Sequence, residues 1–241
     1  MKKEITVIFF LFYSSVNSSV REKRLVLHSS DDVFNEIQNL KLENANIKAS
    51  LDALIKDTGS VYTRWGKTDC DGNATEKVYS GYTAGTPYDN SGGAASYICL
   101  PENPTWAKFV EGLQNEGAYI SGTEFESGYS NTFNPFPKNM LNQDAPCVVC
   151  RSPRPTSIMI PGKTDCYSGW TLEYTGYLMS GHYSYKGGTD YACVDANPDA
   201  VLHGERDQNG KLFYFVEVKC GSLPCQEYPQ GRELACVVCT K

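Results

Sequence analysis

A short cysteine motif occurs twice in this sequence, as Cys147-Val-Val-Cys150 and as Cys236-Val-Val-Cys239. Aligning the two copies also aligns Gly66-Lys-Thr-Asp-Cys70 with Gly162-Lys-Thr-Asp-Cys166. Two further pairs of segments match in the same order, namely Tyr79-Ser-Gly-Tyr82 with Tyr174-Thr-Gly-Tyr177 and Tyr97-Ile-Cys99 with Tyr191-Ala-Cys193. Two copies of a unit this long cannot form a solenoid, so the pattern predicts a duplicated subdomain.

The composition favours short strands and turns over helices. The 241 residues include 16 Tyr, 21 Gly and 12 Pro, a mixture that suits β-structure. The formal net charge of -6 argues against nucleic acid and anionic membranes as partners. All of the Gly and Pro residues lie after Thr58, so the composition changes at Gly59 and predicts a domain boundary there.

Residues 1–18 have the features of a secretory signal peptide. Lys2 and Lys3 precede an apolar run over 5–13, and Val16-Asn-Ser18 supplies small residues for cleavage. The apolar run is too short to span a bilayer, and no later stretch is long and apolar enough to do so. We therefore expect a secreted, extracellular protein without a membrane span, in which residues 19–30 form a linker.

The segment 31–57 is predicted to be a helix, with an N-cap among Ser30, Asp31 and Asp32. Its apolar residues recur at alternating steps of four and three, as in a coiled-coil seam. Glu36 and Lys41 occupy flanking positions that bring opposite charges together in a parallel coil. The predicted oligomerisation residues are Val33, Ile37, Leu40, Asn44, Ile47, Leu51 and Leu54.

The coiled-coil pattern leaves the number of helices open. Ile37 with Leu40 favours two strands, whereas Leu51 with Ile47 favours more. The alternative interpretation is an amphipathic helix that packs on its own domain.

Beyond Gly59 the sequence predicts a mostly β fold, in two disulfide-linked halves over 60–155 and 156–241. The clearest strand is Lys211–Lys219, and other strands are expected at Tyr97–Leu100 and Cys147–Cys150. Residues 126–146 are expected to form a long loop. Turn signals separate the strands at Asp71-Gly72, Ser91-Gly-Gly93, Gly187-Gly188 and Asn209-Gly210.

The ten cysteines have two interpretations, as metal ligands or as disulfides. Two Cys-x-x-Cys pairs together suit a tetrathiolate zinc site. However, each pair belongs to its own repeat, and a secreted chain meets an oxidising compartment. We therefore expect structural disulfides and no metal or other cofactor.

Residues 61–241 resemble the C-terminal region of invertebrate short-chain (spongin-type) collagens, and more distantly the non-collagenous C-terminal domain of type IV collagen. The resemblance is carried by Val61-Tyr-Thr-Arg-Trp-Gly-Lys-Thr-Asp-Cys70, Cys147-Val-Val-Cys-Arg-Ser-Pro153, Cys166-Tyr-Ser-Gly-Trp170 and the closing Cys236-Val-Val-Cys239. The chain lacks a Gly-X-Y tract, so it cannot form a collagen triple helix. The predicted coiled coil occupies the place of that tract.

The resemblance implies two similar β-rich halves that assemble as a trimer. It also implies nested disulfides in each half, plus a small loop in the second half. The implied pairs are Cys70 with Cys150, Cys99 with Cys147, Cys166 with Cys239, Cys193 with Cys236, and Cys220 with Cys225.

Three weaker motifs point to ligands or modification. Asp69, Asp71 and Asn73 alternate as in a calcium loop, but the distant bidentate Glu of such loops is missing. Asn73-Ala-Thr75 is an N-glycosylation sequon in a predicted turn. A Gly-rich aromatic segment supplies four candidate ligand contacts: Tyr177, His182, Tyr183 and Tyr185. The alternative interpretation is that these side chains fill a core poor in Leu and Ile.

The sequence shows no signature of catalysis. It has three His, and it contains no nucleophile elbow, His-x-x-x-His or phosphate loop. We expect a secreted structural or adhesive homotrimer that binds extracellular matrix proteins or glycans. The alternative is a lectin-like recognition protein that binds carbohydrate.

Overall fold

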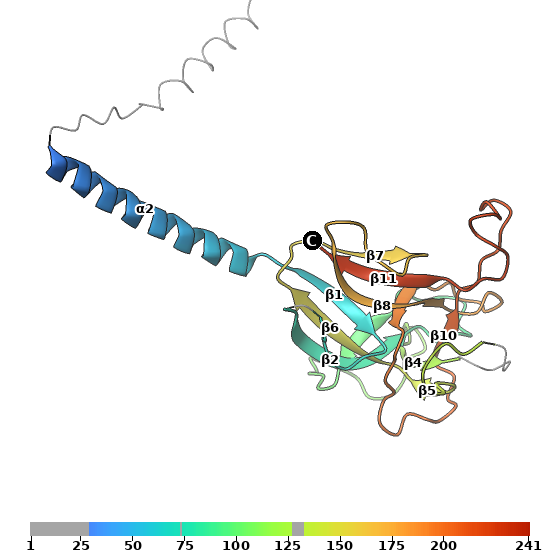
Figure 1. The fold of residues 1–241 in the computed structure, drawn as a ribbon. Helices are drawn as coiled ribbons and strands as arrows, with labels where there is room; N and C mark the ends of the chain where they lie inside the picture. Colours follow the sequence, from blue (N-terminus) through green and yellow to red (C-terminus); the bar gives the residue numbers. More distant parts are fainter. Residues whose placement is uncertain (1–28, 73, 127–132) are drawn as a thin grey trace, which may run out of the picture. The chain divides into compact units, whose positions relative to one another are not determined.

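The structure, a computed structural model, describes residues 29–72, 74–126 and 133–241. The chain divides into two compact units at Ala53 and Leu54. The first contains most of the single described helix, α2 (Ser30–Asp57), and the second contains all of the strands (Figure 1). Within the described residues, no helix is long and apolar enough to cross a membrane. The predicted signal peptide and most of the linker lie outside the described residues.

Helix α2 begins one residue earlier than the sequence predicts. The Ser29 hydroxyl accepts a hydrogen bond from the Asp32 amide at 3.2 Å and donates one to the Asp32 carboxylate at 2.9 Å. Ser29 is therefore the N-cap, and the expectation of a cap among Ser30, Asp31 and Asp32 is wrong. Asp31 and Asp32 lie in the first turn, where their charges are favourable to the helix dipole.

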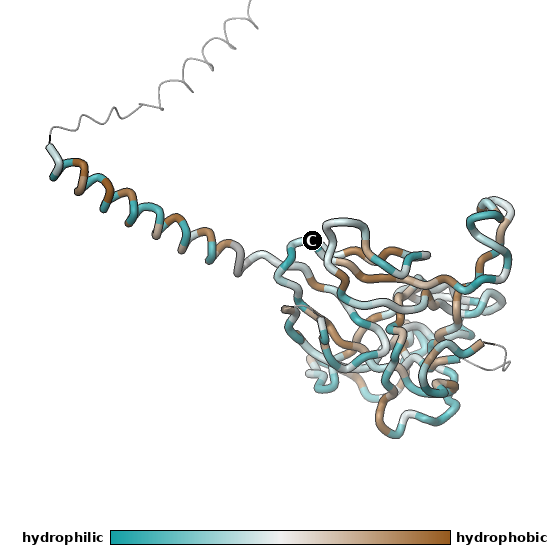
Figure 2. Tube along the Cα trace, in the orientation of Figure 1, coloured by the Kyte–Doolittle hydropathy of each residue, from teal (hydrophilic) through white to brown (hydrophobic). Residues whose placement is uncertain are grey.

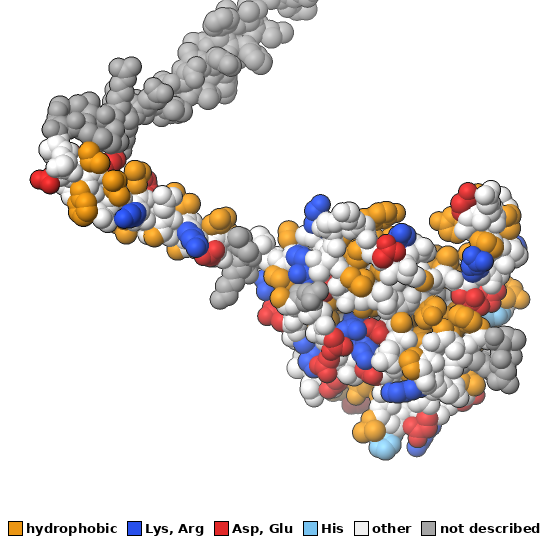
Figure 3. Space-filling view, viewed as in Figure 1, with side chains coloured by type: hydrophobic (Ala, Val, Ile, Leu, Met, Phe, Trp, Pro, Cys, Tyr) orange, Lys and Arg blue, Asp and Glu red, His pale blue; other side chains and the backbone are white. Residues whose placement is uncertain are grey.

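The apolar seam of α2 is exposed within its own unit. Each apolar seam residue is more than one third exposed, from Val33 at 37% to Leu54 at 65%. Hydrophobic positions recur along the helix in Figure 2, and Figure 3 shows their side chains on its surface. The helix is thus confirmed, while its packing against partner helices remains a prediction.

The second unit is mostly β and contains eleven strands. The first half holds β1 (Ser60–Trp65), β2 (Glu76–Gly85), β3 (Ile98–Pro101), β4 (Ser121–Phe125), β5 (Gln143–Asp144) and β6 (Pro146–Ser152). The second half holds β7 (Ser157–Pro161), β8 (Thr171–Ser180), β9 (Ala192–Asp195), β10 (Lys211–Phe215) and β11 (Ala235–Thr240).

The strands pair in one order within each half. In the first half β6 lies between β1 and β2, and β2 also pairs with β3 and β4. In the second half β11 lies between β7 and β8, and β8 also pairs with β9 and β10. Between the halves β1 pairs with β9, and β10 pairs with β4. Because β10 contacts both β4 and β8, the strands close into a ring.

Two predicted elements differ from the structure in extent. The strand expected over Lys211–Lys219 ends at Phe215. The Val216 amide still bonds to Leu178 of β8, and the chain then leaves β8, because the Val218 amide bonds to Arg232 instead. The loop expected over 126–146 contains the short strand β5 and the start of β6.

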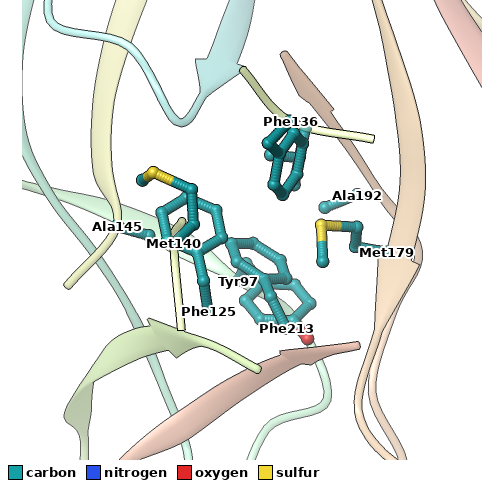
Figure 4. Packing of buried hydrophobic residues seen from close by; sticks show 9 residues of the cluster. Tyr97, Phe125, Phe136, Met140, Ala145, Met179, Ala192 and Phe213 are labelled. Carbon is teal, nitrogen blue, oxygen red and sulfur yellow. The ribbon is translucent and has the colours of Figure 1, made fainter. Parts of the chain in front are cut away.

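An aromatic core joins the two halves. Tyr97 stacks on Phe213 at 4.4 Å between ring centroids, and Phe125 lies 5.9 Å from Phe213. Figure 4 shows these rings side by side, with Met140 and Met179 flanking them. Since Tyr97 and Phe125 come from the first half and Phe213 from the second, this packing holds the halves together.

A buried ion pair also joins the halves. The Arg64 guanidinium of β1 lies 2.7 Å from the Asp195 carboxylate of β9, and both side chains are buried. Arg64 also lies over the Tyr174 ring, 5.4 Å from its centroid. Breaking such a pair leaves a buried charge without compensation, so the pair fixes the position of β1 against β9.

Five disulfides connect the ten cysteines, and no cysteine is free. They are the five pairs that the resemblance implies: Cys70–Cys150, Cys99–Cys147, Cys166–Cys239, Cys193–Cys236 and Cys220–Cys225. Disulfides at this density are typical of proteins from oxidising compartments.

The long-range disulfides should stabilise the fold more than the short one. Replacing Cys99 and Cys147 by Ser opens a loop with a sequence separation of 48, which the chain-entropy relation values at about 4 kcal/mol. The same change at Cys220 and Cys225, with a separation of 5, should cost about 2 kcal/mol. Denaturant unfolding of both double variants would measure this, and equal losses would contradict it.

Candidate ligand-binding site

A cavity of about 160 Å³ lies between two loops at the joint of the two halves. One loop, 86–95, follows β2, and the other, 181–189, follows β8. Lys211 and Leu212, at the start of β10, complete the lining. The cavity is therefore built from both halves, and the topology brings its parts together because β10 pairs with β4 and β8.

Backbone contacts hold the two loops in place. The Asp190 amide donates a hydrogen bond to the Ala95 carbonyl at 3.2 Å, and the Tyr88 amide donates one to the Gly210 carbonyl at 3.0 Å. Gly187 approaches the Asn90 carbonyl so closely that a Cβ there would lie 3.0 Å from its oxygen. The walls are thus fixed by main-chain contacts, which favours a preformed cavity.

An aromatic group lies beside the cavity. The rings of Tyr88 and Tyr185, one from each loop, are 4.6 Å apart and both line the cavity. The hydroxyls of Tyr185 and Tyr214 lie 3.1 Å apart, and the His182 ring is 5.0 Å from the ring of Tyr214. Tyr183 is 94% exposed and contacts His182 at 4.4 Å between centroids.

The structure brings together three of the four predicted ligand contacts. His182, Tyr183 and Tyr185 form one group, whereas Tyr177 lies apart from it. Its ring packs at 5.5 Å from Phe215 and 5.9 Å from Phe136, against the core. Tyr177 is therefore a packing residue, because its place in β8 turns it toward the inside of the ring of strands.

Lys211 is, together with Tyr88, a residue of this site that the sequence did not reveal. Its side chain is 1% exposed, its Nζ donates to the Ala95 carbonyl at 3.0 Å, and it lies 4.6 Å from the centroid of the Tyr97 ring. Burial lowers the pKa of Lys211, and the charge of Asp190 acts in the opposite direction. The two-residue period of a strand could have predicted the burial of Lys211, since it shares a face of β10 with Phe213 and Phe215.

The weak calcium candidate does not form an open site. Asp69 lies 2.6 Å from the ammonium of Lys77, and Asp71 lies 3.2 Å from the guanidinium of Arg64. Both carboxylates are therefore neutralised by cations. Asn73, the third calcium candidate and the glycosylation candidate, lies outside the described residues. Within the described residues, no group of three or more His, Cys, Asp or Glu side chains could hold a metal ion.

No protein-family model matches this sequence.

Two buried carboxylates lie at the end of β4. Glu124 and Glu126 are buried, and the charge of Asp207 acts on both. Burial, assisted by the charges of Asp207 and Glu124, raises the pKa of Glu126 to about 7. Burial also raises the pKa values of Glu124 and Asp144.

This raised pKa predicts a pH-dependent stability. Between pH values of about 4.5 and 7, Glu126 holds its proton in the folded chain and loses it in the unfolded chain, so the free energy of unfolding falls as the pH rises. The loss is at most about 3 kcal/mol. Glu126→Gln should reduce this slope in denaturant unfolding, and Glu111→Gln, at an exposed site, should leave it unchanged. A slope unaffected by Glu126→Gln would contradict the prediction.

Proposed function

We propose that this chain is a secreted structural or adhesive protein, in which a disulfide-linked β head is gathered into a homotrimer by the helical segment. The observation that carries the proposal is the exposed apolar seam of α2. Seven residues of α2 recur in coiled-coil spacing, and six of them are apolar. No other part of the described helical unit covers these side chains. Burying such a seam against other copies removes apolar surface from water and supplies the driving force for assembly.

We also propose that the head arose by duplication of one β-rich unit. The common strand order of the two halves supports this, with β6 central in one and β11 central in the other. The disulfide plan supports it as well, because in each half the second cysteine of the Cys-Val-Val-Cys motif, Cys150 or Cys239, is bonded to the first cysteine of that half. These are also the features that the resemblance to collagen C-terminal domains implies.

A second surface of the head supports association between copies. The segment 102–120 has no strand and exposes large apolar side chains, among them Trp106 at 76% and Leu113 at 84%. Elsewhere on the same unit, an open groove of about 300 Å³ lies between β1 and β7, with Val61 and Ile158 on its walls. An exposed apolar segment of one copy that enters the groove of the next would make a head-to-tail contact, which can close into a ring.

The function follows from multivalency. Three heads on one helical bundle present three copies of every surface to a matrix protein or a glycan. Weak single contacts then add up to firm attachment, without any chemical step.

The assembly can be tested with a matched pair of variants on α2. Leu40 lies in the seam, and Leu42 lies on the opposite face of the same turn; both are exposed within the helical unit. Leu40→Ser should weaken the trimer at least tenfold in analytical ultracentrifugation, because it removes apolar area from the seam, whereas Leu42→Ser should not. A monomeric wild-type chain at high concentration, or equal effects of the two variants, would contradict the assignment.

The aromatic cavity favours carbohydrate recognition as the second candidate function. Tyr88 and Tyr185 offer ring faces beside a small cavity, and tyrosine combines an apolar face with a polar hydroxyl. Such groups suit a sugar, which has apolar C–H faces and polar edges.

A binding screen distinguishes the two functions. The secreted protein would be applied to a glycan array and to immobilised matrix proteins. Binding that free sugar abolishes, and that Tyr185→Ala reduces, supports recognition of carbohydrate. Binding to matrix proteins alone, unaffected by Tyr185→Ala, supports the adhesive function. Absence of both kinds of binding would contradict both.

A further inference from the structure

Five glycines line the cavity between the two loops, and the fold itself explains three of them. Gly93 has a φ of +113°, in the left-handed region that favours glycine. A Cβ at Gly181 would lie 2.9 Å from the hydroxyl oxygen of Thr189. A Cβ at Gly187 would lie 3.0 Å from the carbonyl oxygen of Asn90. These three positions lack either the room or the backbone conformation for a side chain.

The other two lining glycines, Gly92 and Gly188, have no such explanation within the chain. Neither has a φ in the left-handed region, and a Cβ added at either would meet no atom of the described chain within 4 Å, its chain neighbours apart. Alanine at such a position would stabilise the fold, because it restricts the unfolded chain more than glycine does. Glycine instead keeps the space beside the cavity open, and it is the residue that lets a ligand approach the backbone closely.

The charges around the cavity favour a neutral ligand. Lys211 is the one charged residue of the lining, and it is 1% exposed. Its ammonium lies between the Ala95 carbonyl and the Tyr97 ring, and the charge of Asp190 already acts on it. The lining therefore presents no free charge, and a charged group that entered the cavity would lose water without gaining a counterion.

The other lining residues suit a small ring that carries hydroxyl groups. Among the described residues, none is hydrogen-bonded to the hydroxyl of Thr86 or of Ser91, and a hydroxyl both donates and accepts. Tyr88 and Tyr185 supply aromatic rings. The volume of about 160 Å³ is below the roughly 300–1,000 Å³ of pockets for drug-sized molecules, so the cavity admits one ring and not a chain of sugars.

We propose that this cavity binds one neutral sugar ring of hexose size, and that Gly92 and Gly188 leave the room for it. The apolar face of the sugar lies against the tyrosine pair of the cavity, and its hydroxyl groups bond to Thr86 and Ser91. The proposal rests on carbohydrate recognition, the second candidate function, and names the class of sugar and the residues that admit it.

A panel of neutral monosaccharides tests the class of ligand, namely glucose, galactose, mannose and N-acetylglucosamine. Titration of the full mature chain, followed by protein NMR, would give each dissociation constant. We expect at least one of these sugars to bind. Its uronic acid and its amino sugar, one anionic and one cationic, should each bind at least about threefold more weakly, because the lining offers neither a counterion. A charged form that binds as tightly as the neutral sugar would overturn the neutral class.

Alanine variants test the two glycines. Gly92→Ala and Gly188→Ala should each weaken binding of the same sugar about tenfold, because one methyl group takes up space that the ligand needs. Both variants should keep the unfolding temperature of the wild-type chain, since the fold has room for the methyl group. Gly122→Ala is the matched control, because Gly122 in β4 also has no atom near an added Cβ and does not line the cavity. It should change the affinity by less than about twofold.

The outcomes separate this site from carbohydrate recognition in general. A sugar that binds the wild-type chain and both cavity variants equally, or that the Gly122→Ala chain loses as well, would overturn the assignment of the site and leave carbohydrate recognition intact. Binding of none of the monosaccharides would overturn the proposal, while the glycan array would still report separately on larger glycans.

Discussion

Each half of the β unit is organised by one central strand that carries two disulfides. In β6, Cys147 and Cys150 are three residues apart, so their side chains point to opposite faces of the strand. One bridge reaches Cys99 in β3, and the other reaches Cys70 in the segment before β2. The strand β11 carries its two bridges in the same way. Covalent links on both faces fix the register of the neighbouring strands, and the loops that leave those strands are placed as a consequence.

The two halves are joined by non-covalent contacts instead of disulfides. Stacked rings of Tyr97 and Phe213 and the buried pair of Arg64 and Asp195 connect elements far apart in the sequence. The loops 86–95 and 181–189 end at this joint, which explains why the cavity draws its walls from both halves. A rigid joint keeps the aromatic rings and Lys211 in one geometry, and a fixed geometry lowers the entropic cost of binding a small ligand.

The sequence predicted the features that depend on local pattern. Heptad spacing predicted the helix within one residue, and the predominance of β structure followed from composition and period. Side-chain pairings were not predictable from spacing alone, and the disulfide pairs followed only from the resemblance. The calcium candidates Asp69 and Asp71 form ion pairs with Lys77 and Arg64, and no spacing rule predicts such ion pairs. Tyr177 and Tyr185 look alike in sequence, but only the closed ring of strands places one against the core and the other at the cavity. The resemblance to collagen C-terminal domains and the assembly that it implies remain predictions.

The disulfide plan is the central claim, because the strand register within each half depends on it, and the loops around the cavity follow those strands. Peptide mapping of the secreted protein under non-reducing conditions tests it most directly. We expect linked peptides that join Cys70 to Cys150 and Cys99 to Cys147 in the first half, with the corresponding pairs in the second. Free thiols, or linked peptides that connect a cysteine of the first half to one of the second, would contradict the account.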